Sequence, residues 1–258
     1  MKILFFGDIF GKPGRKAVGT FLSSVKRNID YDLCIANCEN AADGRGITEK
    51  SAQELFAAGV DLFSSGNHLW DRKEGLEFIT NDTRIAKPLN YPKASPGNEY
   101  IIKNINSTRF MLVSLCGQAF MTAVDSPFFA LERLLDNLPD KPKCVLIDFH
   151  AESTAEKRTL AHYFDGKVSA ILGTHTHIQT ADEEILPNGT AYITDVGMCG
   201  SHDSVIGIRK EIAIEKIKTG LPVRHITADS GIQINAVLIE LDDNTGKAVY
   251  IKRIREKL

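Results

Sequence analysis

The sequence predicts a mixed α/β protein, and three features of the chain support this prediction. Short apolar runs alternate with segments whose apolar residues recur at helical spacing. Polar residues able to bind metals follow several of these runs directly, where open α/β sheets usually hold ligands. No internal repeat, low-complexity tract or long linker interrupts the 258 residues, so we expect a single domain over residues 1–258.

Apolar runs of strand length predict the sheets. In chain order they cover residues 2–6, 32–37, 60–64, 100–102, 110–115, 144–149, 168–172, 191–194, 235–241 and 248–254. The polar segment at 104–107 predicts a hairpin between two of these runs. The Asp- and Asn-rich turn at 242–246 predicts a second hairpin at the end of the chain.

Helical spacing of apolar residues predicts five helices between these strands. The first follows a turn at Pro13-Gly14, and its apolar face would carry Val18, Phe21, Leu22 and Val25. A second helix is expected to begin near Thr48, after a glycine-rich loop at 43–46, and to end at Gly59. The remaining three are expected over residues 128–138, 155–164 and 210–218.

Composition and charge exclude several classes of protein. Twenty Gly, nine Pro and a formal net charge of −2 argue against a disordered or collagen-like chain and against a broad attraction to nucleic acid. No apolar run approaches the roughly 18–20 residues of a membrane span, and the apolar start is too short for a signal peptide. We therefore expect a cytoplasmic protein with no membrane partner. The five cysteines form no CxxC pair, so we expect them to be reduced and buried.

Short polar motifs at the ends of the predicted strands carry the chemistry. They are Gly7-Asp8-Ile9-Phe10, Cys38-Glu39-Asn40, Gly66-Asn67-His68, Phe149-His150 and Gly173-Thr174-His175-Thr176-His177. Carboxylate, amide and imidazole donors in this number suit two divalent ions rather than one. Two metals about 3.5–4 Å apart can bind both the entering and the leaving oxygen of a phosphoryl displacement. The sequence therefore indicates a metal-dependent phosphoesterase.

Each motif taken alone also has a structural explanation. Turn, capping or surface positions would account for Asp8, Glu39, Asn40, Asn67 and His68, and a hydrogen-bonded place at the core edge for His150. The His-x-His pair is more specific. Residues two apart in an extended segment face the same side, so we expect both rings of this pair to reach a common metal site.

The ordered set of motifs resembles the calcineurin-like metallophosphoesterase superfamily, whose pattern runs Asp-x-His, Gly-Asp, Gly-Asn-His, His and Gly-His-x-His. The chain departs from this pattern in three places. Phe10 replaces the first His, Glu39-Asn40 replaces the usual bridging Asp, and Leu69 follows His68 where an acid is common. These departures and the segment 7–14 are similar to the bacterial YmdB-like branch, and the resemblance covers residues 1 to about 207.

This resemblance implies a four-layer αββα sandwich with two metal ions, usually assigned as iron in this branch. The ligand types alone leave manganese and zinc open. By resemblance, one ion would be held by Asp8, Glu39, Asn40 and His177. The other would be held by Glu39, Asn67, His150 and His175. His68 becomes the proton donor, and Asp71 could orient it.

The expected reaction is hydrolysis of cyclic nucleotides, with 2′,3′-cyclic nucleotides favoured by the resemblance. A metal-bridging hydroxide would attack phosphorus, and His68 would protonate the departing ribose oxygen. One alternative is a regulatory metal-dependent protein that binds nucleotides or RNA with little turnover. Another is a metal-stabilised structural domain, which the position of the ligands at strand ends disfavours.

The expected partner is a small phosphodiester such as a cyclic nucleotide. RNA is a second candidate, and a homo-oligomer is common for bacterial enzymes of this size. Three basic residues in loops near the motifs could hold phosphate, although solvated side chains are the favoured explanation: Lys12, Arg15 and Arg45. His202 and Asp203 could line the pocket, whereas His162 and His225 are expected to be structural or exposed.

Overall fold

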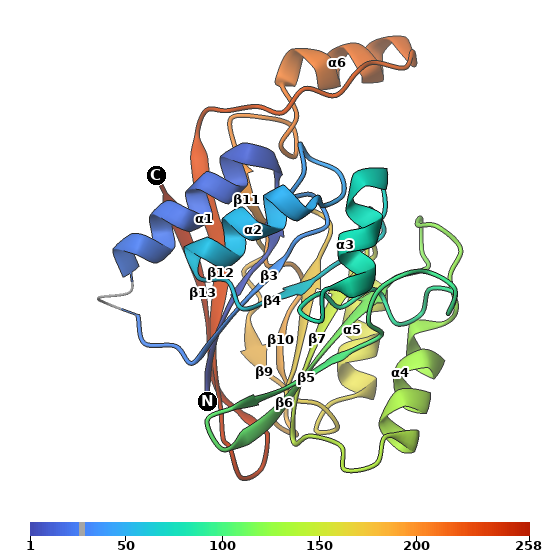
Figure 1. Ribbon diagram of the computed structural model, residues 1–258, viewed down its shortest axis with the longest axis vertical. Helices are drawn as coiled ribbons and strands as arrows, with labels where there is room; N and C mark the ends of the chain where they lie inside the picture. The colour runs from blue at the N-terminus through green and yellow to red at the C-terminus, as the bar shows by residue number, and fades with distance from the viewer. Residues whose placement is uncertain (26–28) are drawn as a thin grey trace.

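The computed structural model describes residues 1–25 and 29–258, and the strands of this part form two sheets (Figure 1). The first sheet contains β1 (Lys2–Phe6), β2 (Asp8–Ile9), β3 (Leu33–Asn37), β4 (Leu62–Ser64), β11 (Met198–Ser201), β12 (Ile232–Leu241) and β13 (Ala248–Lys257). Their order is β2-β11-β12-β1-β3-β4, with β13 paired to β12. Because β1, β3 and β4 are parallel, their carboxyl ends share one edge of the sheet.

The second sheet is also mainly parallel. It contains β5 (Ile101–Ile105), β6 (Thr108–Cys116), β7 (Cys144–His150), β8 (Ala170–Thr174), β9 (Glu184–Ile185) and β10 (Ala191–Ile193), in the order β5-β6-β7-β8-β10-β9. The strands β6, β7, β8 and β10 run in one direction, and β5 forms the predicted antiparallel hairpin with β6. The carboxyl ends of β7 and β8 are therefore neighbours.

Helices accompany the two sheets, and most of them cover the outer faces. The helices are α1 (Gly11–Val25), α2 (Glu49–Ala58), α3 (Leu76–Asn81), α4 (Pro127–Asn137), α5 (Thr154–Tyr163) and α6 (Lys210–Thr219), with a short 3-10 helix η1 (Lys73–Gly75). In Figure 1, α6 stands at the top, away from the sheets, and none of its residues is buried. Among the described residues, no helix combines the length and apolar character needed to cross a membrane.

Three apolar clusters hold these layers together. Phe21 of α1 and Leu55 of α2 pack with Phe6 on one face of the first sheet. Phe5 points to the opposite face, as alternation along a strand requires, and packs with Leu146 of β7 between the two sheets. A third cluster joins the other face of the second sheet to α4 and α5. The result is a mixed α/β fold with two sheets, as the sequence predicts.

Most predicted elements are confirmed, and the differences lie at helix starts and in short strands. Thr48 caps α2 and Gly59 ends it with a left-handed φ of 113°, as predicted. The helix α1 begins at Gly11, so Pro13 lies inside its first turn, where no backbone N–H is needed. The side chain of Val25 lies outside the described residues. The sequence missed β2, β9, β11, η1 and α3, which are too short to show a period.

All five cysteines are buried and free of disulfides, which confirms the prediction made from their spacing. Burial raises the pKa of the Cys199 thiol to about 12 and that of Cys144 to about 11. These thiols are therefore protonated at neutral pH and serve as small apolar side chains of the core.

Candidate metal centre

The predicted site residues converge where strands of the two sheets end. Glu39 and Asn40 follow β3, and Asn67 and His68 follow β4. From the second sheet, His150 is the last residue of β7 and the His-x-His segment follows β8. Asp8 lies in β2, next to β11, at the same end of the first sheet. The topology thus brings five distant motifs to one place, as the pattern of strand ends predicts.

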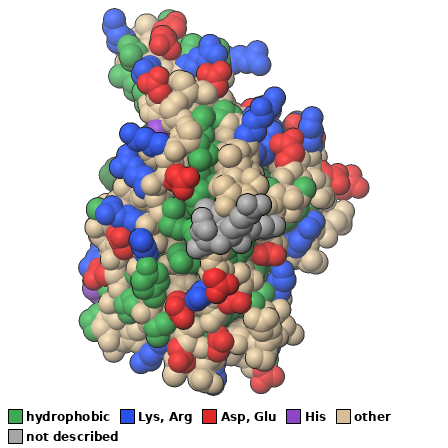
Figure 2. Space-filling model, turned by 90° about the vertical axis from the view of Figure 1, so that its left-hand side faces the viewer, with side chains coloured by type: hydrophobic (Ala, Val, Ile, Leu, Met, Phe, Trp, Pro, Cys, Tyr) green, Lys and Arg blue, Asp and Glu red, His purple; other side chains and the backbone are tan. Residues whose placement is uncertain are grey.

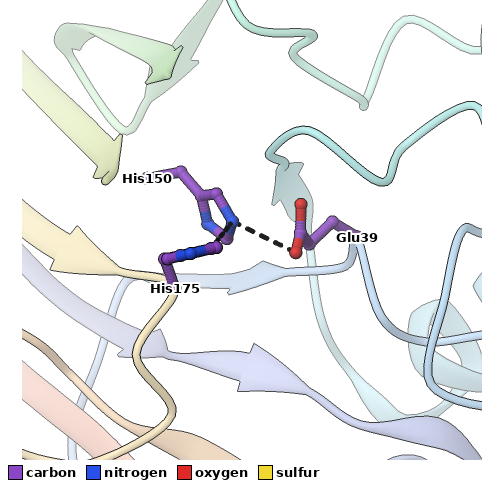
Figure 3. Close-up of side chains that lie close together, drawn as sticks. All are labelled: Glu39, His150 and His175. Atoms are coloured by element: carbon purple, nitrogen blue, oxygen red, sulfur yellow. Dashed lines mark hydrogen bonds and ion pairs between the residues drawn. The ribbon is translucent and has the colours of Figure 1, made fainter. Parts of the chain in front are cut away.

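Glu39, His150 and His175 form the tightest part of this cluster (Figure 3). Oε1 of Glu39 lies 3.1 Å from Nε2 of His150. Nδ1 of His175 lies 3.0 Å from the same imidazole nitrogen. One donor atom from each residue falls within 4.8 Å of the others, so the three could hold a metal ion.

A second group of donors consists of Asp8, Asn40 and His177. Oδ1 of Asp8 is 3.8 Å from Nδ1 of His150 and 3.9 Å from Nε2 of His177. The amide Nδ2 of Asn40 is 3.0 Å from Oε1 of Glu39 and 3.2 Å from Nε2 of His177. Because Glu39 contacts both groups, its carboxylate is the natural bridge between them.

The hydrogen bonding of two buried oxygens shows whether the site suits a metal ion. Oδ1 of Asp8 and Oδ1 of Asn67 accept no hydrogen bond from any described residue. A buried acceptor left unpaired costs about 1–3 kcal/mol, so such atoms are rare without a function. Both belong to oxygen donors of the type that iron, manganese and zinc accept. The donor set and the two unpaired oxygens therefore fit a metal centre.

Hydrogen bonds to the outer nitrogens orient two of the imidazoles. Nδ1 of His150 lies 2.9 Å from Oγ1 of Thr174, whose hydroxyl donates to Asp148 at 2.6 Å. Nδ1 of His177 lies 3.0 Å from the carbonyl oxygen of Ile206. An Nδ1–H held in this way leaves Nε2 turned toward the site. The motifs contained Thr174 without giving it a role and did not include Asp148, although an acid inside the apolar run 144–149 was a usable signal.

A buried ion pair anchors the loop that carries His175 and His177. Nζ of Lys157 lies 2.9 Å from Oδ2 of Asp195, and both side chains are almost fully buried. Asp195 also accepts hydrogen bonds from the backbone N–H of Thr176 at 3.0 Å and of Gly197 at 2.8 Å. Sequence reasoning missed this pair, because a Lys on a helix is indistinguishable from a solvated one.

The His-x-His segment reaches the site by a route that differs from the prediction. His175 has a φ of 103° and His177 a φ of 67°, so the segment is bent rather than extended. The expectation that both rings would face one side through strand alternation was wrong. The bend places His175 against His150 and His177 against Asp8, on the two sides of Glu39.

The charges of Glu39 and His150 shift the pKa values of the residues in this cluster. Burial alone would lower the pKa of His150, but the carboxylate of Glu39 outweighs it and raises the value to about 9. Burial would raise the pKa of Glu39, yet His150 holds it at about 2. Burial, reinforced by the charge of His150, lowers the pKa of His175 to about 3. A proton thus stays on His150 at neutral pH, and a metal bound there would displace it.

His68 lies beside this cluster and is held by an ion-paired arginine and aspartate. Nδ1 of His68 is 2.9 Å from Oδ2 of Asp71 and 3.1 Å from Nη2 of Arg45. Arg45 also pairs with Asp71 at 3.0 Å, and the backbone N–H of His68 donates to Oε2 of Glu39 at 3.0 Å. With Nδ1 engaged, Nε2 is the nitrogen left for a substrate, and the amide Nδ2 of Asn67 lies 3.5 Å from it. Asp71 is therefore in position to orient His68.

Comparison with known proteins identifies the family. The model of the YmdB-like proteins matches residues 4–254. The chain belongs to the YmdB-like family. It is 42% identical to the Bacillus subtilis 2′,3′-cyclic-nucleotide 2′-phosphodiesterase, over 98% of this chain and 96% of that protein.

Solved structures agree with this membership. A hypothetical protein of Thermus thermophilus is 41% identical and superimposes with a TM-score of 0.94, over 100% of this chain and 99% of its own. A phosphatase of Mycoplasma pneumoniae is 34% identical with a TM-score of 0.95, over 100% and 93% of the two chains. This YmdB-like chain is therefore a hydrolase acting on phosphoric diesters.

The cluster opens into a cavity of about 1140 Å³. Its buried part is lined by Glu39, Asn40 and His177, and its more exposed part by Arg45 and His68. His175 and His225 also line it, whereas four other residues considered from sequence do not: Lys12, Arg15, His202 and Asp203. Arg15 pairs with Glu54, Asp203 with Lys210, His202 contacts the carbonyl oxygen of Met198, and Lys12 is an exposed residue of α1.

Gly66 leaves room for Glu39 and His150, the ligands expected from the sequence, and its replacement by Ala is expected to reduce metal content. A Cβ at this position would lie 2.3 Å from Oε2 of Glu39 and 2.3 Å from Cδ2 of His150. The methyl group would push both ligands aside without backbone strain. Metal analysis of purified protein tests this. Gly19→Ala, whose Cβ would meet only Ala58 at 3.7 Å, is the control. Equal metal content in both variants would contradict the expectation.

Proposed function

We propose that this YmdB-like protein is a dinuclear metal-dependent phosphodiesterase that hydrolyses cyclic nucleotides, with 2′,3′-cyclic nucleotides as the favoured substrates. The observation that carries the proposal is the cluster of buried Asp8, Glu39 and His150 with half-buried His175, beside an open cavity that Glu39 and His175 line. One carboxylate oxygen of this cluster accepts no hydrogen bond from the described residues. The name of the Bacillus subtilis relative supports the choice of substrate. We also propose that residues 1–258 form one domain, a four-layer αββα sandwich.

The donors divide into two ligand sets that share Glu39. Asp8, Glu39, Asn40 and His177 would hold one ion, and Asn40 would turn its terminal amide to present Oδ1. Glu39, Asn67, His150 and His175 would hold the other. When bound, such a pair stabilises charge on the phosphoryl oxygens and lowers the pKa of a water from 15.7 toward about 7. Imidazole and carboxylate donors accommodate iron, manganese and zinc, and the family resemblance favours iron.

The protein's own residues would complete the reaction. A water that has lost one proton to the solvent would form a bond to phosphorus through its oxygen, while the bond from phosphorus to the 2′ oxygen breaks. His68 would donate the proton of Nε2 to the departing 2′ oxygen, so that no strongly basic alkoxide is released. The Nδ1–H of His68 would donate to Oδ2 of Asp71, and Arg45 pairs with the same carboxylate, so Nε2 would face the substrate.

Hydrolysis assays on purified protein test the proposal. Adenosine 2′,3′-cyclic and 3′,5′-cyclic phosphates would be compared, with metal identity and content measured on the same sample. Turnover of the 2′,3′-cyclic substrate with about two metals per chain is the expected result. Two bound metals without turnover of any phosphodiester would instead favour the regulatory binding protein. Absence of metal after reconstitution would refute the metal centre itself.

Replacing His68 by Ala is expected to lower kcat by about 10²–10⁴-fold, the usual contribution of a general acid. Metal content should stay near that of the unaltered protein, because no proposed ligand is removed. Asp71→Asn should give a smaller loss, since it alters only the orientation and charge of His68. Loss of metal in His68→Ala in parallel with activity would show that His68 is a ligand or a structural residue.

A further inference from the structure

The cavity extends well beyond the metal centre. Its volume of about 1140 Å³ exceeds the roughly 300–1,000 Å³ typical of pockets for small ligands. The additional wall comes from α6 and the segment that follows it, and its members are Lys216, Arg224, His225, Ile226 and Thr227. A cyclic mononucleotide bound at the metal centre has no second phosphate to place against this wall.

We propose that this wall, formed by Lys216, Arg224 and His225, binds a second phosphate of the substrate, of the kind that an oligoribonucleotide ending in a 2′,3′-cyclic phosphate carries. The inference rests on the proposed phosphodiesterase function and extends it from mononucleotides to RNA ends. The scissile phosphate would lie at the metal centre, and the preceding phosphate of the strand would lie against the wall.

Charge on the wall supports this assignment. Lys216 and Arg224 are exposed, and no carboxylate of the described part of the chain forms an ion pair with either. Nζ of Lys216 lies 3.3 Å from Nε2 of His225, which keeps three nitrogen-bearing groups together on the cavity. By contrast, Arg45 is already paired with Asp71 and Arg72 with Asp43. Unpaired cations facing a cavity are suited to phosphate oxygens.

The wall and the metal side belong to one cavity, since Lys216 and Arg224 line it together with Glu39 and His177. Burial and the positive charges of Lys216 and Arg45 also lower the pKa of His225. Ile206 and Ile226 are exposed on the cavity between polar groups and offer apolar contact to a base or ribose. In Figure 2 the protruding helix at the top carries several Lys and Arg side chains.

Because the side chains of the wall are exposed, they can be replaced without disturbing the core. No residue of α6 is buried, so Lys216→Ala combined with Arg224→Ala should leave folding unchanged. The matched control is Lys218→Ala combined with Lys252→Ala, which removes the same charge from exposed positions outside the cavity. The binding probe is a fluorescein-labelled trinucleotide with a 3′-phosphate, followed by anisotropy in metal-loaded protein at several salt concentrations.

The wall variant is expected to bind this trinucleotide on the order of tenfold more weakly at low salt, and its salt slope should fall by about 0.7 for each phosphate that the protein no longer neutralises. Turnover of adenosine 2′,3′-cyclic phosphate should be unchanged. The control should match the unaltered protein in both measurements. Equal trinucleotide affinity in the two double variants would overturn the proposal. A changed molecular mass of the wall variant in solution would also overturn it, by showing that the wall joins two copies of the chain.

A comparison of kcat/KM between substrates shows whether the second phosphate must belong to a strand. A gain in kcat/KM for 5′-phosphorylated adenosine 2′,3′-cyclic phosphate, abolished in the wall variant, would show that one additional phosphate suffices. A gain confined to a trinucleotide with a cyclic end would show that a strand is required; both results support the subsite. Turnover of mononucleotides without either gain would refute the subsite alone. Weaker trinucleotide binding in the wall variant of a protein without turnover would support the subsite and refute the proposed function.

Discussion

Glu39→Gln is expected to reduce the turnover of cyclic nucleotides by on the order of 10²–10³-fold and to lower metal content. The carboxylate contacts His150 through Oε1 and the backbone N–H of His68 through Oε2, and it is almost fully buried. Glutamine keeps the shape but loses the charge, and its amide nitrogen cannot bind a cation. Both proposed ligand sets share this residue, so one substitution weakens both.

Glu152→Gln separates this effect from a general loss of negative charge near the site. Glu152 also contacts a proposed ligand, since its Oε2 lies 3.1 Å from Nε2 of His175, but 49% of its side chain is exposed. A solvated carboxylate contributes little to holding a buried cation. We therefore expect metal content and turnover of Glu152→Gln to stay within a few-fold of the unaltered protein. Retention of about two metals and of turnover in Glu39→Gln would exclude the bridging role.

The sequence predicted the position of the site because its residues lie at strand ends. Parallel strands bring their carboxyl ends to one edge of a sheet, so Glu39 after β3 lies near the residues that follow β4, and His150 at the end of β7 lies near those that follow β8. The packing of the two sheets, which the strand pattern does not predict, brings these two edges together. The order of the motifs along the chain is the basis of the family resemblance. Apolar runs likewise predicted most strands of both sheets, and helical spacing of apolar residues predicted most of the helices.

The sequence did not predict the residues that position the site residues without belonging to the motifs. Asp195 follows β10 and Lys157 lies in α5, and nothing in their spacing shows that they meet. The bend at His175 and His177 depends on that pair and on local backbone conformation rather than on a period. The wall around Lys216 was predicted only as a helix, because the placement of an exposed helix over a cavity depends on the loops that connect it.

Lys157→Met is expected to lower the free energy of unfolding by about 3–5 kcal/mol, since it leaves a buried carboxylate without its counter-ion. Only 1% of the Lys157 side chain and 0% of the Asp195 side chain are exposed, so water cannot replace the missing ammonium group. The Lys157 ammonium also donates to the carbonyl oxygen of Thr174 at 2.8 Å. Urea denaturation at neutral pH measures the change. Lys103→Met is the control, because its pair with Asp61 is 3.8 Å long and about 40% exposed on both sides.

A second substitution distinguishes the charge from the packing. In Lys157→Met combined with Asp195→Asn the buried charge is gone, while Oδ1 of the amide still accepts from the backbone N–H of Gly197. The double variant should therefore recover much of the stability that Lys157→Met loses, as buried pairs do when both charges are removed. If the double variant is no more stable than Lys157→Met, the loss comes from packing instead. A loss of about 1 kcal/mol or less in Lys157→Met, the range of exposed pairs, would contradict a buried ion pair as the anchor of the His175 loop.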